Sequence, residues 1–122
     1  MMDAKKLIGR QGESAAAAYL KKKKYRIVAM NYGYRFGEID LIAEDRDFIV
    51  FVEVKSRKSA GFAQAREFVT EAKQRRLIAT AQLWLMQNPT EKQPRFDVIE
   101  VYCSDGVVRS INHIENAFEV AL

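Results

Sequence analysis

The chain has almost none of the residues that cross-link small proteins through disulfides or metal ions. Its 122 residues include one cysteine, Cys103, and one histidine, His113. A single cysteine excludes an internal disulfide, and these two side chains cannot supply the four nitrogen or sulfur ligands of a structural zinc site. An iron–sulfur cluster needs several cysteines and is excluded in the same way. A chain of this length can bury a substantial core, so we expect hydrophobic packing to hold the fold.

Long apolar runs are missing too. The longest apolar stretches span only a few residues, far short of the roughly 20 that a membrane-spanning helix needs. The segment Met1–Lys6 also lacks the apolar core of a secretory signal. Proline is rare, and its two positions, Pro89 and Pro94, flank one short connection. No repeat or linker divides the chain, so we expect a single domain over residues 1–122 in a cytoplasmic protein with no membrane partner.

Positive charge is in modest excess and unevenly spread. Lysine and arginine number 20 against 16 aspartates and glutamates, which gives a formal net charge of +4. Basic residues gather in the first part of the chain and again in the middle. The middle group is Lys55, Arg57, Lys58, Arg66, Lys73, Arg75 and Arg76. The uneven distribution favours a surface that binds a polyanion, while the small net charge alone indicates little.

Apolar periodicity and turn residues predict an α/β fold. In chain order we expect a helix over 5–23, strands over 25–34, 37–43 and 48–55, a loop over 59–68, a helix over 70–87, strands over 95–103 and 107–111, and a short helix over 114–118. Thr70 is the N-cap candidate of the second helix, and Trp84 belongs to its apolar stripe. The order α-β-β-β-α-β-β predicts a mixed sheet flanked by helices.

The hairpin formed by 37–43 and 48–55 carries the most informative polar residues. If Asp45 and Arg46 form a two-residue turn, strand alternation places Asp40, Glu53 and Lys55 on one face. Asp40 and Glu53 are then diagonal neighbours, on the order of 7–8 Å apart at the backbone. A loop longer by one residue would move Glu53 to the other face.

Two converging carboxylates suggest a metal site. At about 4 Å and an effective dielectric constant near 20, their repulsion is on the order of 4 kcal/mol, which a hard divalent cation such as Mg²⁺ removes. Lys55, farther along the same face, could then orient or activate an attacking water and stabilise charge on a phosphorus. The alternative is a structural ion pair between Lys55 and Glu53, with Asp40 in solvent at the edge of the sheet.

Two further groups have both a functional and a structural interpretation. Glu13 lies on a small-residue face of the first helix, beside Gly9 and Gly12. A carboxylate there is unfavourable unless a metal or a basic side chain compensates it. At the start of the second helix, the helix dipole disfavours positive side chains. The sequence nevertheless places Lys73, Arg75 and Arg76 there. They would either bind phosphate or form a solvated basic face.

Single polar residues elsewhere are less informative. The i+4 and i+7 spacing of Gln74 from Ile78 and Ala81 turns it inward, toward the sheet. His113 is expected at the surface or as a capping residue. For Asp97, which follows Arg95 by two positions, a structural salt bridge is favoured.

The sequence Gly37-Glu38-Ile39-Asp40, followed after twelve residues by Glu53-Val54-Lys55, resembles the D–x(n)–E-x-K core of PD-(D/E)XK nucleases. The archaeal Holliday-junction resolvases of that group contribute a further glutamate from a preceding helix, and Glu13 matches it. The whole chain, from about Lys6 to Phe118, resembles the YraN-like family of uncharacterised bacterial proteins. The matching segments are 12–13, 37–43, 51–57, 73–74, 76–77, 81–85 and 95–98.

The resemblance implies a restriction-endonuclease-like fold, with an α-β-β-β-α-β core and an added C-terminal strand. It implies a Mg²⁺- or Mn²⁺-dependent endonuclease that acts on DNA, including branched or junction DNA. Metal ligands would be Asp40, Glu53 and Glu13. Lys55 would serve the nucleophile and Gln74 would support the site. The phosphate-binding residues would be Arg57, Arg66, Lys73, Arg75 and Arg76, with Phe62 beside them.

The resemblance has two departures and leaves two other functions open. Ile39 replaces the proline of the motif, and Ile78 stands where a RecB-type exonuclease would have tyrosine, which argues against that branch. The alternatives are a nucleic-acid-binding module without turnover and a protein-interaction domain without affinity for DNA. Since one catalytic centre cuts one strand, junction resolution would require a homodimer.

Overall fold

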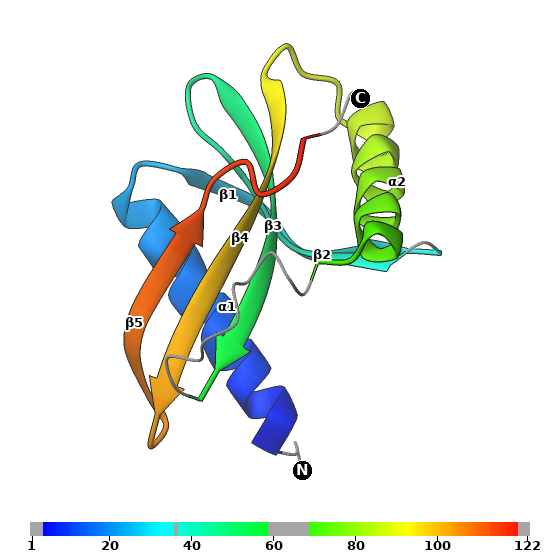
Figure 1. Cartoon of the computed structure of the whole chain (residues 1–122). Helices are drawn as coiled ribbons and strands as arrows, with labels where there is room; N and C mark the ends of the chain where they lie inside the picture. Colours follow the sequence, from blue (N-terminus) through cyan, green and yellow to red (C-terminus); the bar gives the residue numbers. More distant parts are fainter. Residues whose placement is uncertain (1–3, 36, 59–68, 120–122) are drawn as a thin grey trace.

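The computed structural model describes residues 4–35, 37–58 and 69–119. Five strands form one mixed sheet in the order β1-β2-β3-β4-β5, in which only the β3–β4 pair is parallel (Figure 1). The elements are α1 (Ala4–Lys22), β1 (Arg26–Tyr34), β2 (Gly37–Glu44), β3 (Phe48–Arg57), α2 (Glu71–Gln87), β4 (Gln93–Ser104) and β5 (Val107–Ile114). The predicted order of these elements, and the α/β class with a mixed sheet, are confirmed.

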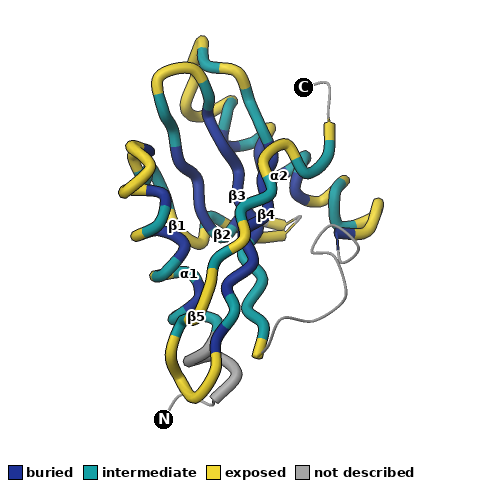
Figure 2. Tube along the Cα trace, turned by 60° about the vertical axis from the view of Figure 1, so that its left-hand side comes forward, coloured by how far each residue is buried: buried dark blue, intermediate teal, exposed yellow. Residues whose placement is uncertain are grey.

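The helices cover opposite faces of the sheet, and the central strands β3 and β4 are its most buried part (Figure 2). On the α1 side, Leu20 packs with Val50 and Val52. On the α2 side, Phe51 packs with Trp84, as the stripe predicted. Because β3 alternates between two apolar cores, its first five residues are apolar without interruption.

Helix α2 is the crossover that joins the parallel strands β3 and β4, a connection that needs more than a tight turn. Its predicted N-cap is confirmed, since Thr70 Oγ1 accepts a hydrogen bond from the backbone N of Lys73 at 3.2 Å. The predicted loop over 59–68 lies outside the described residues. Neither α1 nor α2, as far as they are described, is long and apolar enough to cross a membrane.

The position predicted for the β2–β3 hairpin turn, at Asp45 and Arg46, is wrong by one residue. Beyond the pair Glu44–Ile49, the backbone N of Asp45 donates to Phe48 O at 3.1 Å, which leaves Arg46 and Asp47 as the turn. Asp45 Oδ1 accepts hydrogen bonds from the backbone N of Asp47 at 2.9 Å and of Phe48 at 2.8 Å, so its side chain fixes the turn at this position. The register moves by two positions, which keeps every side chain on its predicted face.

The short helix predicted over 114–118 is also wrong. Strand β5 continues to Ile114, and Asn116 adopts a left-handed conformation with φ of 50°. Backbone donors of this segment bind β4 instead of an intrahelical ladder: Ala117 N donates to Phe96 O at 2.8 Å. The ring of Phe118 stacks on Phe96 with centroids 4.9 Å apart. Contacts with the sheet therefore replace the helix that local sequence suggests.

Candidate metal and phosphate site

The candidate site lies where β2 separates from β3. The ladder between these strands ends with Leu41 opposite Val52, and β2 then turns toward the start of α2 (Figure 1). One residue beyond the ladder, Asp40 Oδ2 accepts a hydrogen bond from the backbone N of Val54 at 2.7 Å. The side chain of Asp40 therefore accepts a hydrogen bond from the backbone of β3. Continued by one residue, the register would set Asp40 directly opposite Glu53, closer than the predicted diagonal.

Three carboxylates converge at this point. Oxygen atoms of Glu13, Glu38 and Asp40 all lie within 4.8 Å of one another. Glu13 reaches the group from α1, as predicted, and the other two come from β2. Glu38 was missed by the sequence reasoning, although it lies two residues before Asp40 on one strand, and that spacing places both on one side. Asp40 and Glu13 are half-buried and Glu38 is exposed.

Glu53 lies outside this group of three but shares a pocket with two of its members, Glu38 and Asp40. The pocket has a volume of about 330 Å³ and is lined by Gly37, Glu38, Asp40, Glu53, Lys73, Arg76 and Leu77. Glu53 is 7% exposed. Its Oε1 atom lies 2.5 Å from Lys73 Nζ and 3.4 Å from Lys55 Nζ. The ion pair with Lys55 is the one that the structural alternative predicted, whereas Asp40 is half-buried rather than in solvent.

The crowded acids alter the proton affinity of the pocket. Burial, followed by the negative charge of Glu53, raises the pKa of Asp40 to about 7, although the hydrogen bond from Val54 N opposes the rise. Glu13 and Glu38 raise this pKa further. Burial and the nearby Lys73 lower the pKa of Lys55. In both groups burial is the largest cause, because the charged form of each side chain is poorly solvated in the pocket.

The donor set fits a hard divalent cation. All the available ligands are carboxylate oxygens, which suit Mg²⁺ or Mn²⁺ rather than a metal that prefers sulfur or nitrogen. Oxygens bound to one Mg²⁺ at about 2.1 Å lie between about 3 and about 4.2 Å apart. The three oxygens within 4.8 Å therefore need only a small inward movement to share an ion. Asp40 and Glu13 would hold it, with Glu38 beside them and Glu53 facing the same space.

The remaining predicted site residues are only partly gathered here. Lys73 and Arg76 line the pocket, whereas Arg75 is exposed on α2. Arg57 lies farther along β3, with its Nε 4.0 Å from Glu100. Gln74 is half-buried, as its spacing suggested, but its amide donates to Val69 O at 3.0 Å and it does not line the pocket. Arg66 and Phe62 lie outside the described residues.

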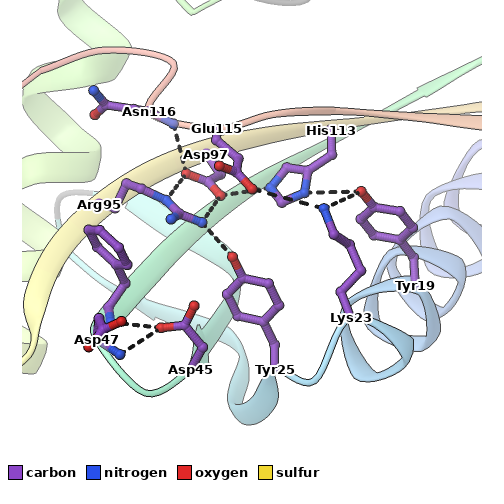
Figure 3. A network of polar contacts seen from close by, with 11 residues as sticks. Tyr19, Lys23, Tyr25, Asp45, Asp47, Arg95, Asp97, His113, Glu115 and Asn116 are labelled. Atoms are coloured by element: carbon purple, nitrogen blue, oxygen red, sulfur yellow. Dashed lines mark hydrogen bonds and ion pairs between the residues drawn. The ribbon is translucent and has the colours of Figure 1, made fainter.

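A separate polar network lies around Asp97 and joins α1, β4 and β5 (Figure 3). Arg95 donates to both carboxylate oxygens of Asp97 at 2.9 Å, which confirms the predicted salt bridge. His113 lies between Asp97, at 2.7 Å, and Tyr19, at 3.2 Å. Its side chain is only 3% exposed, so the expectation of a surface position is wrong. Each group in the network has a partner, which indicates a structural role.

A larger cavity, of about 660 Å³, lies beside this network and is lined by Phe48, Arg95 and Phe118 among others. The guanidinium of Arg95 is already bound to Asp97 and to Tyr25 Oη. Among the described residues, a cluster of metal-ligating groups occurs only at the smaller pocket. The smaller pocket is therefore the candidate site.

Comparison with known proteins gives a family. The family model described as "Uncharacterised protein family UPF0102" matches residues 12–101. A UPF0102 protein of Pelotomaculum thermopropionicum is 45% identical over 120 residues, which cover 97% of this chain and all of that protein. Another, of Vibrio parahaemolyticus, is 48% identical over 93% of each chain. A third, of Symbiobacterium thermophilum, is 49% identical over 91% of this chain and 95% of that protein.

Proposed function

The chain belongs to the UPF0102 family, and we propose that it is a metal-dependent endonuclease that hydrolyses phosphodiester bonds in DNA. One observation carries the proposal. Carboxylate oxygens of Glu13, Glu38 and Asp40 lie within 4.8 Å of one another, beside a pocket that also holds Glu53, Lys73 and Arg76. A cluster of acids next to basic groups suits a metal ion that contacts a phosphate.

Each residue has a defined part in this proposal. Asp40 and Glu13 would hold Mg²⁺ or Mn²⁺, with Glu38 and Glu53 as further acidic neighbours. A bound ion would supply positive charge that polarises a phosphoryl oxygen and makes a coordinated water more acidic. Lys55 Nζ, 3.4 Å from Glu53, orients the attacking water and stabilises negative charge at the phosphorus. Its lowered pKa makes proton exchange easier than for a lysine in solvent.

The fold supports the same proposal. The observed order α1-β1-β2-β3-α2-β4 is the order that a restriction-endonuclease-like core would have, with β5 as the added strand. Membership of the PD-(D/E)XK superfamily is part of the proposal. Branched or junction DNA is the proposed substrate, and a homodimer would place one centre on each of two strands.

The test is cleavage of duplex, nicked, flap and four-way-junction DNA in Mg²⁺ or Mn²⁺, with Glu53→Ala beside the parent protein. We predict that Glu53→Ala abolishes cleavage and leaves DNA binding unchanged or tighter, because a negative charge is removed without loss of a phosphate contact. Glu44→Ala is the matched control, since Glu44 ends the other strand of the same hairpin and pairs with Arg26 and Lys92, away from the pocket. Equal cleavage by Glu53→Ala and the parent would refute the proposal.

A DNA-binding module without turnover is the second candidate. It is favoured by the two lysines at Glu53 Oε1, which neutralise that carboxylate without any metal. Both candidates predict DNA affinity that falls with salt. Titration with Mn²⁺ separates them, because a module of this kind gains neither cleavage nor affinity from the metal.

A further inference from the structure

We propose that Lys73 is a displaceable counterion: it occupies Glu53 when no metal is bound, and a divalent cation entering the pocket releases it to bind a substrate phosphate. The inference rests on the proposed metal site and assigns a regulatory step to it. It explains why Glu53, the buried acid of the pocket, faces basic groups while the other three acids face one another.

Two lysines compete for one carboxylate oxygen of Glu53. Lys73 and Lys55 approach the same atom, Glu53 Oε1, at 2.5 Å and 3.4 Å. Two ammonium groups on one oxygen also repel each other, so a single carboxylate has to hold both. A cation that binds the neighbouring oxygens competes for Glu53 and repels the lysines at the same time.

The position of Lys73 makes it the lysine that leaves. It lies in the first turn of α2, where the helix dipole disfavours a positive charge. Its side chain is 34% exposed against 22% for Lys55, so it lies nearer the open side of the pocket. Lys55 comes from the strand that also carries Glu53 and is more enclosed, which suits a residue that stays beside the reacting group.

The released side chain has a second partner available. Arg76 lies three residues after Lys73 on α2, and both line the pocket, so they present adjacent cations on one helix face. A phosphate at the mouth of the pocket would accept charge-assisted hydrogen bonds from both. Metal binding would therefore increase the affinity for a phosphate, and a bound phosphate would equally favour the metal.

The first test measures Mn²⁺ affinity calorimetrically for the wild type, Lys73→Gln and Arg76→Gln. Removal of the competing ammonium should tighten Mn²⁺ binding by roughly threefold to tenfold in Lys73→Gln. Arg76→Gln removes the same charge from the same pocket. None of the ion pairs among the described residues includes Arg76, so its effect should be at most about twofold. Equal changes in the two variants, or weaker binding in Lys73→Gln, would overturn the inference.

The second test uses the wild type alone, so it does not depend on the folding of a variant. Acetylation of lysines by a small reagent is quantified by mass spectrometry with and without Mg²⁺. Lys73 should react several times faster with Mg²⁺. Lys92 is the internal control, because it is similarly exposed and pairs with Glu44 at 3.2 Å, away from the pocket.

The outcomes separate the inference from the proposed function. If Mn²⁺ and Mg²⁺ bind the wild type but the reactivity of Lys73 does not rise, the metal site stands and displacement is refuted. If no divalent cation binds the wild type or either variant, the metal site itself is refuted, and the inference falls with it.

Discussion

Among single residues, Asp40 connects the fold to the proposed chemistry most directly. Its side chain binds the backbone N of Val54, so it helps to fix the place where β2 leaves β3. The same carboxylate contributes to the group of three acids. Burial and the neighbouring acids raise its pKa to about 7. In the absence of metal, Asp40 therefore retains its proton over a range in which an ordinary aspartate has lost it.

This raised pKa predicts how stability changes with pH. Between about pH 4 and about pH 7 the folded state keeps a proton that the unfolded state releases, so the free energy of unfolding falls as the pH rises. The fall should amount to a few kcal/mol, since each tenfold difference in proton affinity is worth about 1.4 kcal/mol. Urea denaturation in EDTA at several pH values measures it, and Mg²⁺ should restore stability at pH 8.

Asp40→Asn is the matching variant, because an amide oxygen can still accept from Val54 N but does not titrate. The free energy of unfolding of this variant should decline much less as the pH rises. The variant should therefore be more stable than the wild type at pH 8 in EDTA. Asp47→Asn, in the exposed hairpin connection, should keep the wild-type dependence. A decline of the same size in Asp40→Asn would show that other groups cause it.

At the scale of elements, apolar patterns predicted more than polar ones. The stripe that includes Trp84 and the two-faced apolar run of β3 predicted which elements lie in the core, because burial depends on periodicity. The position of the hairpin turn was not predictable in the same way, since the side chain of Asp45 fixes it through hydrogen bonds. The segment after Ile114 depends on contacts with β4, which local sequence does not contain.

The site was predictable in part for related physical reasons. Alternation on β2 and β3 brought Asp40 and Glu53 to one pocket, and a register error of two residues did not change their faces. The ion pair of Lys73 with Glu53 joins residues 20 positions apart in the chain, so only the packing of α2 on the sheet shows it. His113 was misplaced because its partners, Asp97 and Tyr19, come from two other elements.

The packing of α1 on β3 gives a prediction at this scale. A Cβ atom added at Gly12 would overlap with Ser56 Oγ and lie 3.4 Å from Ser56 Cβ, whereas one added at Gly9 meets nothing within 4 Å. Gly9→Ala should therefore stabilise the protein by up to about 1 kcal/mol through helix propensity. Gly12→Ala should destabilise it by about 1–3 kcal/mol through overpacking.

Urea denaturation measures both changes, and a double variant identifies their cause. Ser56→Ala in the Gly12→Ala background removes the overlapping oxygen and should restore part of the lost stability. Equal stabilisation by Gly9→Ala and Gly12→Ala would show that α1 does not pack on β3 at Gly12. Because Glu13 follows Gly12 directly, this close approach also sets how near Glu13 comes to Asp40.

At the scale of the whole molecule, the polar network around Asp97 and the acidic pocket lie at different places on the sheet. The Asp97 network joins β4 and β5 to α1 (Figure 3), while the acidic pocket lies between β2, β3 and α2. The cations of α2 at the pocket give the molecule one face that suits a phosphate backbone. Such a face gives affinity that depends strongly on salt, whatever the sequence of the nucleic acid.

Salt dependence tests the proposal that this face binds DNA. The logarithm of the DNA-binding constant falls linearly with the logarithm of the salt concentration. Each lost phosphate contact reduces the magnitude of this negative slope by about 1. Arg76→Gln should lower this magnitude by about that amount for duplex DNA, because Arg76 lines the pocket. Arg109→Gln, on the exposed part of β5, should leave it unchanged. A decrease for Arg109→Gln with none for Arg76→Gln would show that DNA binds to another face.

The location of the metal is the central claim, and anomalous scattering from Mn²⁺ in crystals of the wild type tests it most directly. The predicted result is a peak in the pocket between Asp40 and Glu13, about 2.1 Å from their carboxylate oxygens, with Glu38 or Glu53 as a further neighbour. Crystals of Asp40→Asn should show no such peak. A pocket without Mn²⁺ at saturating concentration, or a peak that persists unchanged in Asp40→Asn, would contradict the claim.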